Sequence, residues 1–101
     1  MNVDNENMQQ KAMLMIARAG EGKGLAIEAI RLSKQGKLQE AKECLVKSEE
    51  ALRQGHVANA ELLWSEANGQ NGPLSVLLVH AMDHIMNAMT VYDIANEIVG
   101  I

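Results

Sequence analysis

Apolar residues recur along most of the chain in steps of three and four, the spacing of one face of an α-helix. Three such stripes are separated by turn-forming residues, Gly36 after the first and Gly69 to Gly72 after the second. The pattern predicts helices at about residues 7–35, 37–68 and 73–99, with residues 1–6 as a frayed tail. We therefore expect an all-α, antiparallel three-helix bundle that forms one domain over residues 1–101.

Each predicted helix has a seam of residues that should face the core. The first consists of Met8, Ala12, Met15, Ala19, Gly22, Ala26 and Ile30. The second consists of Leu38, Ala41, Leu45, Ser48, Leu52, Gly55, Asn59 and Leu62. The third consists of Leu77, Ala81, His84, Ala88, Val91, Ala95 and Ile98. Because the middle of the second seam is small and polar, we expect a close backbone approach or a buried polar layer there.

A glycine-rich segment, Gly20 to Gly24, interrupts the first predicted helix. Each glycine costs a helix interior up to about 1 kcal/mol relative to alanine. The stripe nevertheless keeps its phase across the segment, which favours one helix with a kink or weak point over two shorter helices. A phosphate-binding loop is not favoured, because the segment lacks the Gly-Lys-Ser/Thr ending and a preceding strand.

The third predicted helix is apolar almost all the way round between Leu74 and Val91. A helix of a small three-helix bundle can bury only one broad stripe against its neighbours. The remaining apolar surface needs another partner, and the simplest is a second copy of the chain. The sequence therefore predicts a homo-oligomer with the third helix near its centre.

Composition narrows the possible function classes. Nearly half of the residues are apolar, and a net charge of −4 argues against a nucleic-acid or anionic-membrane binder. The single cysteine, Cys44, excludes an intrachain disulfide and suits a reducing compartment. The N-terminal segment is too polar for a signal peptide, and no apolar run reaches the roughly 20 residues of a membrane span. We expect a cytoplasmic protein.

Candidate chemistry is concentrated between Val79 and Met86. His80 and His84 lie one helical turn apart and face the same way, with Asp83 on the neighbouring stripe. A neutral imidazole can accept a phosphoryl group and pass it on, which makes His80 a candidate nucleophile. His56 and, less clearly, His84 also fit histidines of a core or interface whose hydrogen bonds are satisfied.

Metal binding is the second interpretation of this segment. Two histidines at this spacing are common zinc ligands, but a His-Glu-x-x-His arrangement is absent and Cys44 is distant in sequence, so a zinc hydrolase is not favoured. In a symmetric trimer, three copies of Asp83 around the axis would instead offer oxygen ligands to a hard cation such as Mg²⁺.

The segment Ser75 to Met86 closely resembles the signature of the lactose/cellobiose-type enzyme IIA (lactose/N,N′-diacetylchitobiose family) of the bacterial phosphoenolpyruvate-dependent sugar phosphotransferase system. In that family the segment reads much like Ser-Leu-Leu-Leu-Val-His-Ala-Gln-Asp-His-Leu-Met. Weaker similarity extends over most of the chain, at Ala19-Gly20, Leu25–Ala29, Gly36–Lys42, His56 and Met89–Asp93.

The resemblance implies a three-helix bundle that trimerises through its third helix. It implies that His80 accepts a phosphoryl group from the phosphocarrier HPr and passes it to a cysteine of enzyme IIB during uptake of a cellobiose- or lactose-type sugar. Contact with the membrane is then only indirect, through enzyme IIC. It further implies that Asp83 from three subunits holds a central divalent cation, Mg²⁺ in our expectation. Apart from the resemblance, His84 is the nearest residue in sequence that could assist His80 by hydrogen bonding.

Several positions depart from the family pattern. Met82 stands where the family usually has Gln, which removes an amide that could hydrogen-bond the phosphoryl group or its surroundings. Asn59-Ala60 replaces a usual Gln-Thr, and Asn87 replaces a usual Thr. These departures leave a second hypothesis open, a divergent, non-catalytic trimeric interaction or regulatory module with the same fold. A third hypothesis is a plain metal-stabilised helical assembly.

Overall fold

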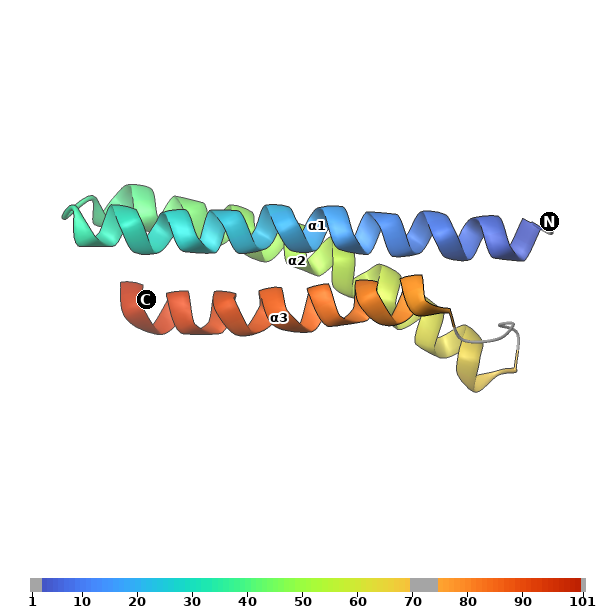
Figure 1. Cartoon of the computed structure of the whole chain (residues 1–101). Helices are drawn as coiled ribbons and strands as arrows, with labels where there is room; N and C mark the ends of the chain where they lie inside the picture. Colours follow the sequence, from blue (N-terminus) through green and yellow to red (C-terminus); the bar gives the residue numbers. More distant parts are fainter. Residues whose placement is uncertain (1–2, 70–74, 101) are drawn as a thin grey trace.

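Three α-helices make up almost all of the structure, a computed structural model that describes residues 3–69 and 75–100. The helices are α1 (Val3–Lys34), α2 (Leu38–Ala67) and α3 (Val76–Val99), and the described residues contain no strand. Successive helices run in opposite directions and form an elongated bundle (Figure 1). The prediction of an all-α, antiparallel three-helix bundle is confirmed.

α1 is one continuous helix of 32 residues that passes through the glycine-rich segment. Figure 1 shows it without a sharp bend. The alternative of two shorter helices is therefore wrong. The expected frayed tail is also wrong for residues 3–6, which already belong to α1, while residues 1–2 lie outside the described part.

The connection from α1 to α2 is a compact turn centred on Gly36. Its φ of 80° is left-handed, as expected for a residue that follows a helix. The Gly36 amide donates to the Ser33 carbonyl at 3.0 Å, and the Lys37 amide donates to the Leu32 carbonyl at 2.9 Å. These two bonds form a Schellman motif. The predicted boundary between the first two helices is thus correct to within one residue.

α3 starts three residues later than predicted. Ser75 has an extended backbone, and its side-chain hydroxyl accepts a hydrogen bond from the Leu78 amide at 3.0 Å, so Ser75 is the N-cap. The expected placement of Pro73 in the first helical turn falls outside the described residues. At the other end, Gly100 is left-handed and closes the helix.

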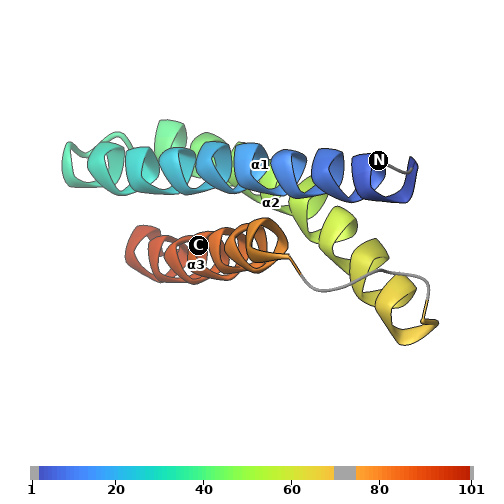
Figure 2. The same ribbon diagram turned by 45° about the vertical axis from the view of Figure 1, so that its right-hand side comes forward.

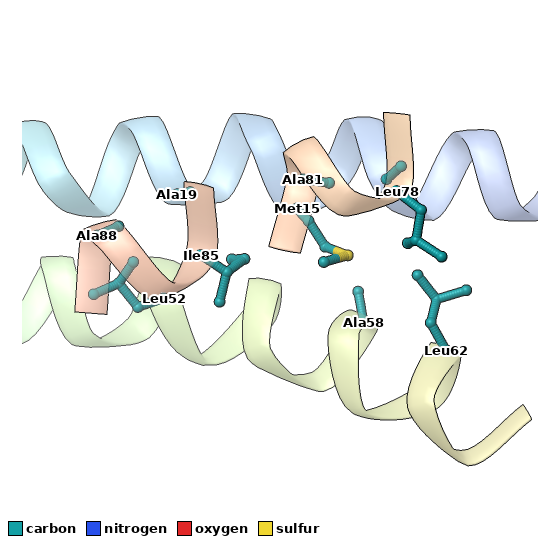
Figure 3. Close-up of a cluster of buried hydrophobic side chains, with 10 residues drawn as sticks. Met15, Ala19, Leu52, Ala58, Leu62, Leu78, Ala81, Ile85 and Ala88 are labelled. Atoms are coloured by element: carbon teal, nitrogen blue, oxygen red, sulfur yellow. The ribbon is translucent and has the colours of Figure 1, made fainter. Parts of the chain in front are cut away.

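α1 makes more contacts with the other helices than either α2 or α3 does. α2 and α3 each pack along it and make fewer contacts with one another. Figure 2 shows the C-terminal turns of α2 diverging from α3. One buried cluster occupies the middle of the bundle, where Leu62 of α2 and Leu78 of α3 point toward one another (Figure 3). A second cluster, around Leu45 and Val99, lies toward the α1–α2 turn.

Two glycines permit the close packing in the middle of the bundle. A Cβ at Gly22 would lie 2.5 Å from the Leu52 side chain, and one at Gly55 would collide with the end of the Ile85 side chain. The buried Ser48 hydroxyl donates to the Gly22 carbonyl at 2.6 Å. The expectation of a small, partly polar middle in the second seam is confirmed, and Asn59 is buried with it.

The predicted seam of α3 is partly wrong. Its buried residues are Leu78, Ala81, Ile85, Ala88, Ala95 and Val99. The alanines of the predicted seam, Ala81, Ala88 and Ala95, are buried as expected and form an alanine stripe. The larger residues predicted for the seam lie on one flank of this stripe, whereas the larger residues that are buried lie on its other flank. His84 is half-buried and Ile98 is 52% exposed. Ile85 enters the core because Gly55 of α2 leaves room for its side chain.

Large apolar side chains remain exposed on the outer face of α3. They are Val76, Val79, Met86, Ile94 and Ile98. This exposure agrees with the expectation that the bundle cannot bury the whole apolar surface of the helix. None of the helices in the described ranges is long and apolar enough to cross a membrane.

Candidate functional site

His80 and His84 form a hydrogen-bonded pair on α3. Their Nε2 atoms are 3.0 Å apart, and the ring centroids are 4.5 Å apart with the planes at 88°. His80 is exposed and His84 is half-buried. The pair therefore has one solvent-facing imidazole supported by a second imidazole.

The local sequence explains this position. Ala81 and Ile85 are completely buried and anchor this turn of α3 against the bundle. His80 and His84 each precede one of these anchors, so both lie on the same side of the buried stripe, four residues apart. The Ser75 cap fixes the start of the helix one turn before His80.

The short contact places one proton between the two rings. A hydrogen bond between two imidazole nitrogens needs one N–H donor and one lone-pair acceptor. If His84 donates, the Nε2 of His80 keeps its lone pair and the proton of His80 is on Nδ1. If His80 donates, its free lone pair is on Nδ1. In the first arrangement the lone pair of His80 Nε2 accepts the hydrogen bond, so that bond has to break before Nε2 can act as a nucleophile, whereas in the second the lone pair on Nδ1 is free.

Asp83 and Met82 lie on other sides of the same helix. Asp83 is exposed on the outer face of α3, next to His80 and among the exposed apolar residues. Met82 is partly buried and packs against the central core cluster. Within one chain, the Met82 side chain therefore contributes to the core on the side of α3 away from His80.

His56 lies on α2, and the groove that it lines includes neither His80 nor His84. It is exposed on α2, so the interpretation of His56 as a core residue is wrong for the single chain. It lines an open groove between α2 and α3, which we call the α2–α3 groove. The groove is lined by Glu49, Leu52, Arg53, His56, Met89, Tyr92 and Asp93.

The α2–α3 groove contains a polar contact that the sequence did not indicate. The Tyr92 hydroxyl donates to a Glu49 carboxylate oxygen at 3.0 Å, across 43 positions of sequence. Burial, the Glu49 hydrogen bond and the charges of Glu49 and Asp93 raise the pKa of Tyr92 above its ordinary value of 10.0. No local pattern signals this pairing, because it depends on how α2 and α3 are placed along α1.

The described residues of one chain form no metal site by themselves. Among residues 3–69 and 75–100, no three histidine, cysteine or carboxylate side chains gather in a way that could hold a metal ion. Asp83 therefore needs ligands from other copies of the chain if it is to bind a cation. Its exposure on the outer face of α3 allows that arrangement.

Comparison with known proteins agrees with the family resemblance of the Ser75 to Met86 segment. The family described as the lactose/cellobiose-specific IIA subunit of the PTS system matches residues 10–101. The lichenan-specific phosphotransferase enzyme IIA component of Bacillus subtilis is 42% identical over 95 residues, which cover 94% of this chain and 86% of that protein.

Solved structures agree with the sequence comparison. The cellobiose-specific enzyme IIA of Bacillus anthracis superposes with a TM-score of 0.87 at 40% identity, covering 98% of this chain and 87% of that one. The IIA component in a solution structure of a chitobiose IIA–HPr complex gives a TM-score of 0.80 at 27% identity, covering 91% and 89% of the two chains.

Proposed function

Since the chain belongs to the lactose/cellobiose-specific IIA subunits of the sugar phosphotransferase system, we propose that it is a phosphohistidine carrier that uses His80 as its phosphoryl acceptor. The exposed His80 imidazole, held by His84 at 3.0 Å, is the observation that carries this proposal. It is the exposed member of the histidine pair and is anchored on a rigid helix, whereas His56 is exposed on α2 beside a different set of side chains.

The donor in this proposal is phosphorylated HPr. A basic ring nitrogen of His80 attacks the phosphorus, and the bond from phosphorus to the donor's leaving atom breaks as the new N–P bond forms. The family resemblance and the HPr complex formed by a chitobiose IIA relative support this choice of donor. Exposure of His80 suits such an exchange, because a second protein has to bring its phosphoryl group within bonding distance.

His84 has a supporting role in this mechanism. When its Nε2–H donates to His80, the proton of His80 is on Nδ1 and the ring is held in place, and this hydrogen bond breaks as the single lone pair of His80 Nε2 attacks phosphorus. After transfer, the same N–H can turn to a phosphoryl oxygen. A hydrogen bond to a charged oxygen is about twice as strong as one between neutral groups, so His84 stabilises the phosphorylated state.

The phosphoryl group then leaves the chain for enzyme IIB. A cysteine thiolate of that protein attacks phosphorus, the N–P bond breaks, and His80 returns to a neutral imidazole. The final acceptor is a cellobiose- or lactose-type sugar entering through enzyme IIC, so the chain acts in the cytoplasm and meets the membrane only indirectly. Relatives named for lichenan, galactose, cellobiose and N,N′-diacetylchitobiose support this sugar class.

The proposed working form is a homotrimer assembled through α3. The exposed apolar residues of its outer face support this assembly. Burying the exposed half of one such side chain gains about 1 kcal/mol, so five of them on each chain favour association. Asp83 lies on the same face, where three carboxylates around the axis would hold a divalent cation, most suitably Mg²⁺, that offsets their mutual repulsion.

Incubation with phosphoenolpyruvate, enzyme I and HPr tests the proposed function. We expect one acid-labile phosphate on each chain, measured by intact-mass spectrometry at neutral pH and again after acid treatment. His80→Ala should abolish the phosphate. His56→Ala is the matched control, because it removes an exposed histidine from α2 and should leave phosphorylation unchanged.

Two outcomes would contradict the proposal. A chain that gains no phosphate while HPr in the same tube becomes phosphorylated favours the non-catalytic interaction module. A chain that gains the same phosphate after His80→Ala shows that another residue is the acceptor.

A further inference from the structure

The α2–α3 groove has features of a binding site that the phosphoryl-carrier function does not use. It lies between α2 and α3, the two helices that make the fewest contacts with one another, and encloses about 270 Å³. None of the residues that line it belongs to the histidine pair. The groove therefore needs an explanation of its own.

The floor of the groove is apolar. Leu52 is buried, and Met89 and Tyr92 are partly buried, so together they form a hydrophobic base. Methionine side chains are unbranched and flexible, and they adapt to partners of different shape. The floor thus suits the aliphatic part of a flexible side chain.

The rim of the groove carries a net negative charge, because its arginine is paired with a glutamate that does not line the groove. Arg53 is the cation at the rim, and its guanidinium donates to both carboxylate oxygens of Glu50, at 2.7 and 3.1 Å. This pair lowers the pKa of Glu50 and raises that of Arg53, so both stay charged and neutralise one another. Glu49 of α2 and Asp93 of α3 then leave two negative charges among the residues that line the groove.

Glu49 keeps the capacity to bind a cation. Its Oε2 accepts the Tyr92 hydroxyl, while a carboxylate has about four lone-pair positions on two oxygens. Tyr92 thus holds the Glu49 carboxylate at the groove and leaves the other oxygen free for a donor. Asp93 is exposed on the next position of α3.

We propose that the α2–α3 groove is a docking site for an arginine or lysine side chain presented by a partner protein. The alkyl stem lies on Leu52 and Met89, and the cationic head meets Glu49 and Asp93. Long cationic side chains commonly bury their stems along apolar surface while the charge stays at the rim. The groove is open and slightly smaller than usual small-molecule pockets, which fits one side chain better than a free ligand.

Two peptides of matched sequence test this proposal. The first is the blocked peptide Ala-Leu-Arg-Leu-Ala, and the second carries citrulline, a neutral isostere, in place of arginine. Both are titrated into the whole isotope-labelled protein, and backbone amide signals are followed by NMR. We expect saturable shifts at Glu49, Leu52, Met89 and Tyr92, with about fivefold weaker binding of the citrulline peptide.

Charge-removing variants locate the binding site. Glu49→Gln combined with Asp93→Asn should reduce binding of the arginine peptide to the level of the citrulline peptide. Glu43→Gln combined with Glu66→Gln is the matched control, because it removes the same charge from exposed positions of α2 that do not line the groove. The control should bind the arginine peptide as the unaltered chain does.

Several results would overturn the proposal. Equal binding of the two peptides, or unchanged binding after Glu49→Gln/Asp93→Asn, would show that the acidic rim is not the recognition element. Free arginine that binds as tightly as the peptide would point to a small molecule rather than a protein. A paramagnetic relaxation agent that fails to reach the Met89 methyl group would show that a second copy covers the groove. None of these measurements requires phosphorylation, so their outcome is independent of the proposed function.

Discussion

At the scale of single residues, the hydrogen bond between His80 and His84 is the contact on which the proposed phosphoryl transfer depends. The two rings share one proton over 3.0 Å. His80 is exposed to solvent, whereas His84 is half-buried against the bundle. The two residues therefore have different environments although their side chains are the same.

His84→Ala should slow phosphorylation of His80 without abolishing it. The variant removes a hydrogen bond to a group that becomes charged, worth about 1.5 to 3 kcal/mol, so we expect a rate at least about tenfold lower. The measurement is the initial rate of phosphate incorporation from HPr. His84→Gln keeps an amide donor and should recover part of the rate. A His84→Ala rate equal to that of the unaltered chain would leave His84 without a role in transfer.

Tyr92 should titrate above the ordinary tyrosine range. Its pKa is raised by burial and by Glu49, so folding favours the neutral phenol. This contribution to stability is complete below the ordinary pKa of 10.0 and is lost as the pH rises through the higher folded value. The chain has one tyrosine, so tyrosinate absorbance reports it directly. Glu49→Gln should lower the folded pKa, and an unchanged titration would contradict the contact.

At the scale of elements, the glycines of α1 have unequal roles. Gly22 faces α2, where the Leu52 side chain and the Ser48 carbonyl leave no room for a Cβ. Gly20 and Gly24 have nothing within 4 Å of an added Cβ and are exposed. The helix therefore passes through this segment because α2 packs against it, in spite of the local propensity.

Gly24→Ala should stabilise the chain, while Gly22→Ala should destabilise it. The first substitution adds helix propensity worth up to about 1 kcal/mol and meets no neighbour. The second forces the Leu52 side chain or the α1–α2 contact to move, which we expect to cost about 1 to 3 kcal/mol. Urea denaturation followed by circular dichroism measures both. Shifts of the same sign in the two variants would contradict the packing described for α1.

At the scale of the whole molecule, the outer face of α3 is the surface through which the proposed trimer would assemble. Its exposed apolar residues and Asp83 are arranged along one helix. In the proposed trimer, three copies of this face would meet around a threefold axis.

Ile94→Glu should dissociate the proposed trimer. The variant places a charge on the exposed face of α3, where Ile94 is 53% exposed in the single chain. Sedimentation equilibrium should show three chains for the unaltered protein and one for the variant. Val46→Glu, at a position of α2 that is 68% exposed, is the control and should remain a trimer. A monomeric unaltered chain at micromolar concentration would refute the assembly.

Removal of divalent cations should lower the thermal stability of the trimer. Three Asp83 carboxylates around one axis repel one another unless a cation neutralises them. Melting temperatures with a chelator and with added Mg²⁺ should differ for the unaltered chain and coincide for Asp83→Asn. Equal melting temperatures for the unaltered chain under both conditions would mean that Asp83 holds no ion.

The sequence by itself determined the helices, their order and most of the core. Hydrophobic periodicity placed most of the seams of α1 and α2, although Leu38, the first residue predicted for the second seam, is exposed. The glycine after the first stripe located the α1–α2 turn. Both signals are local in sequence. The sequence also predicted His80, His84 and Asp83 as the candidate functional residues of α3.

The tertiary structure decided which flank of α3 is buried and which contacts and grooves form between the helices. Two flanks of the alanine stripe are about equally apolar, and the space beside Gly55 selects Ile85 for the core and leaves His84 half-buried next to His80. The Tyr92–Glu49 contact and the α2–α3 groove likewise arise from the positions of two helices along α1. Such features depend on shape complementarity between distant segments, which periodicity along one segment does not encode.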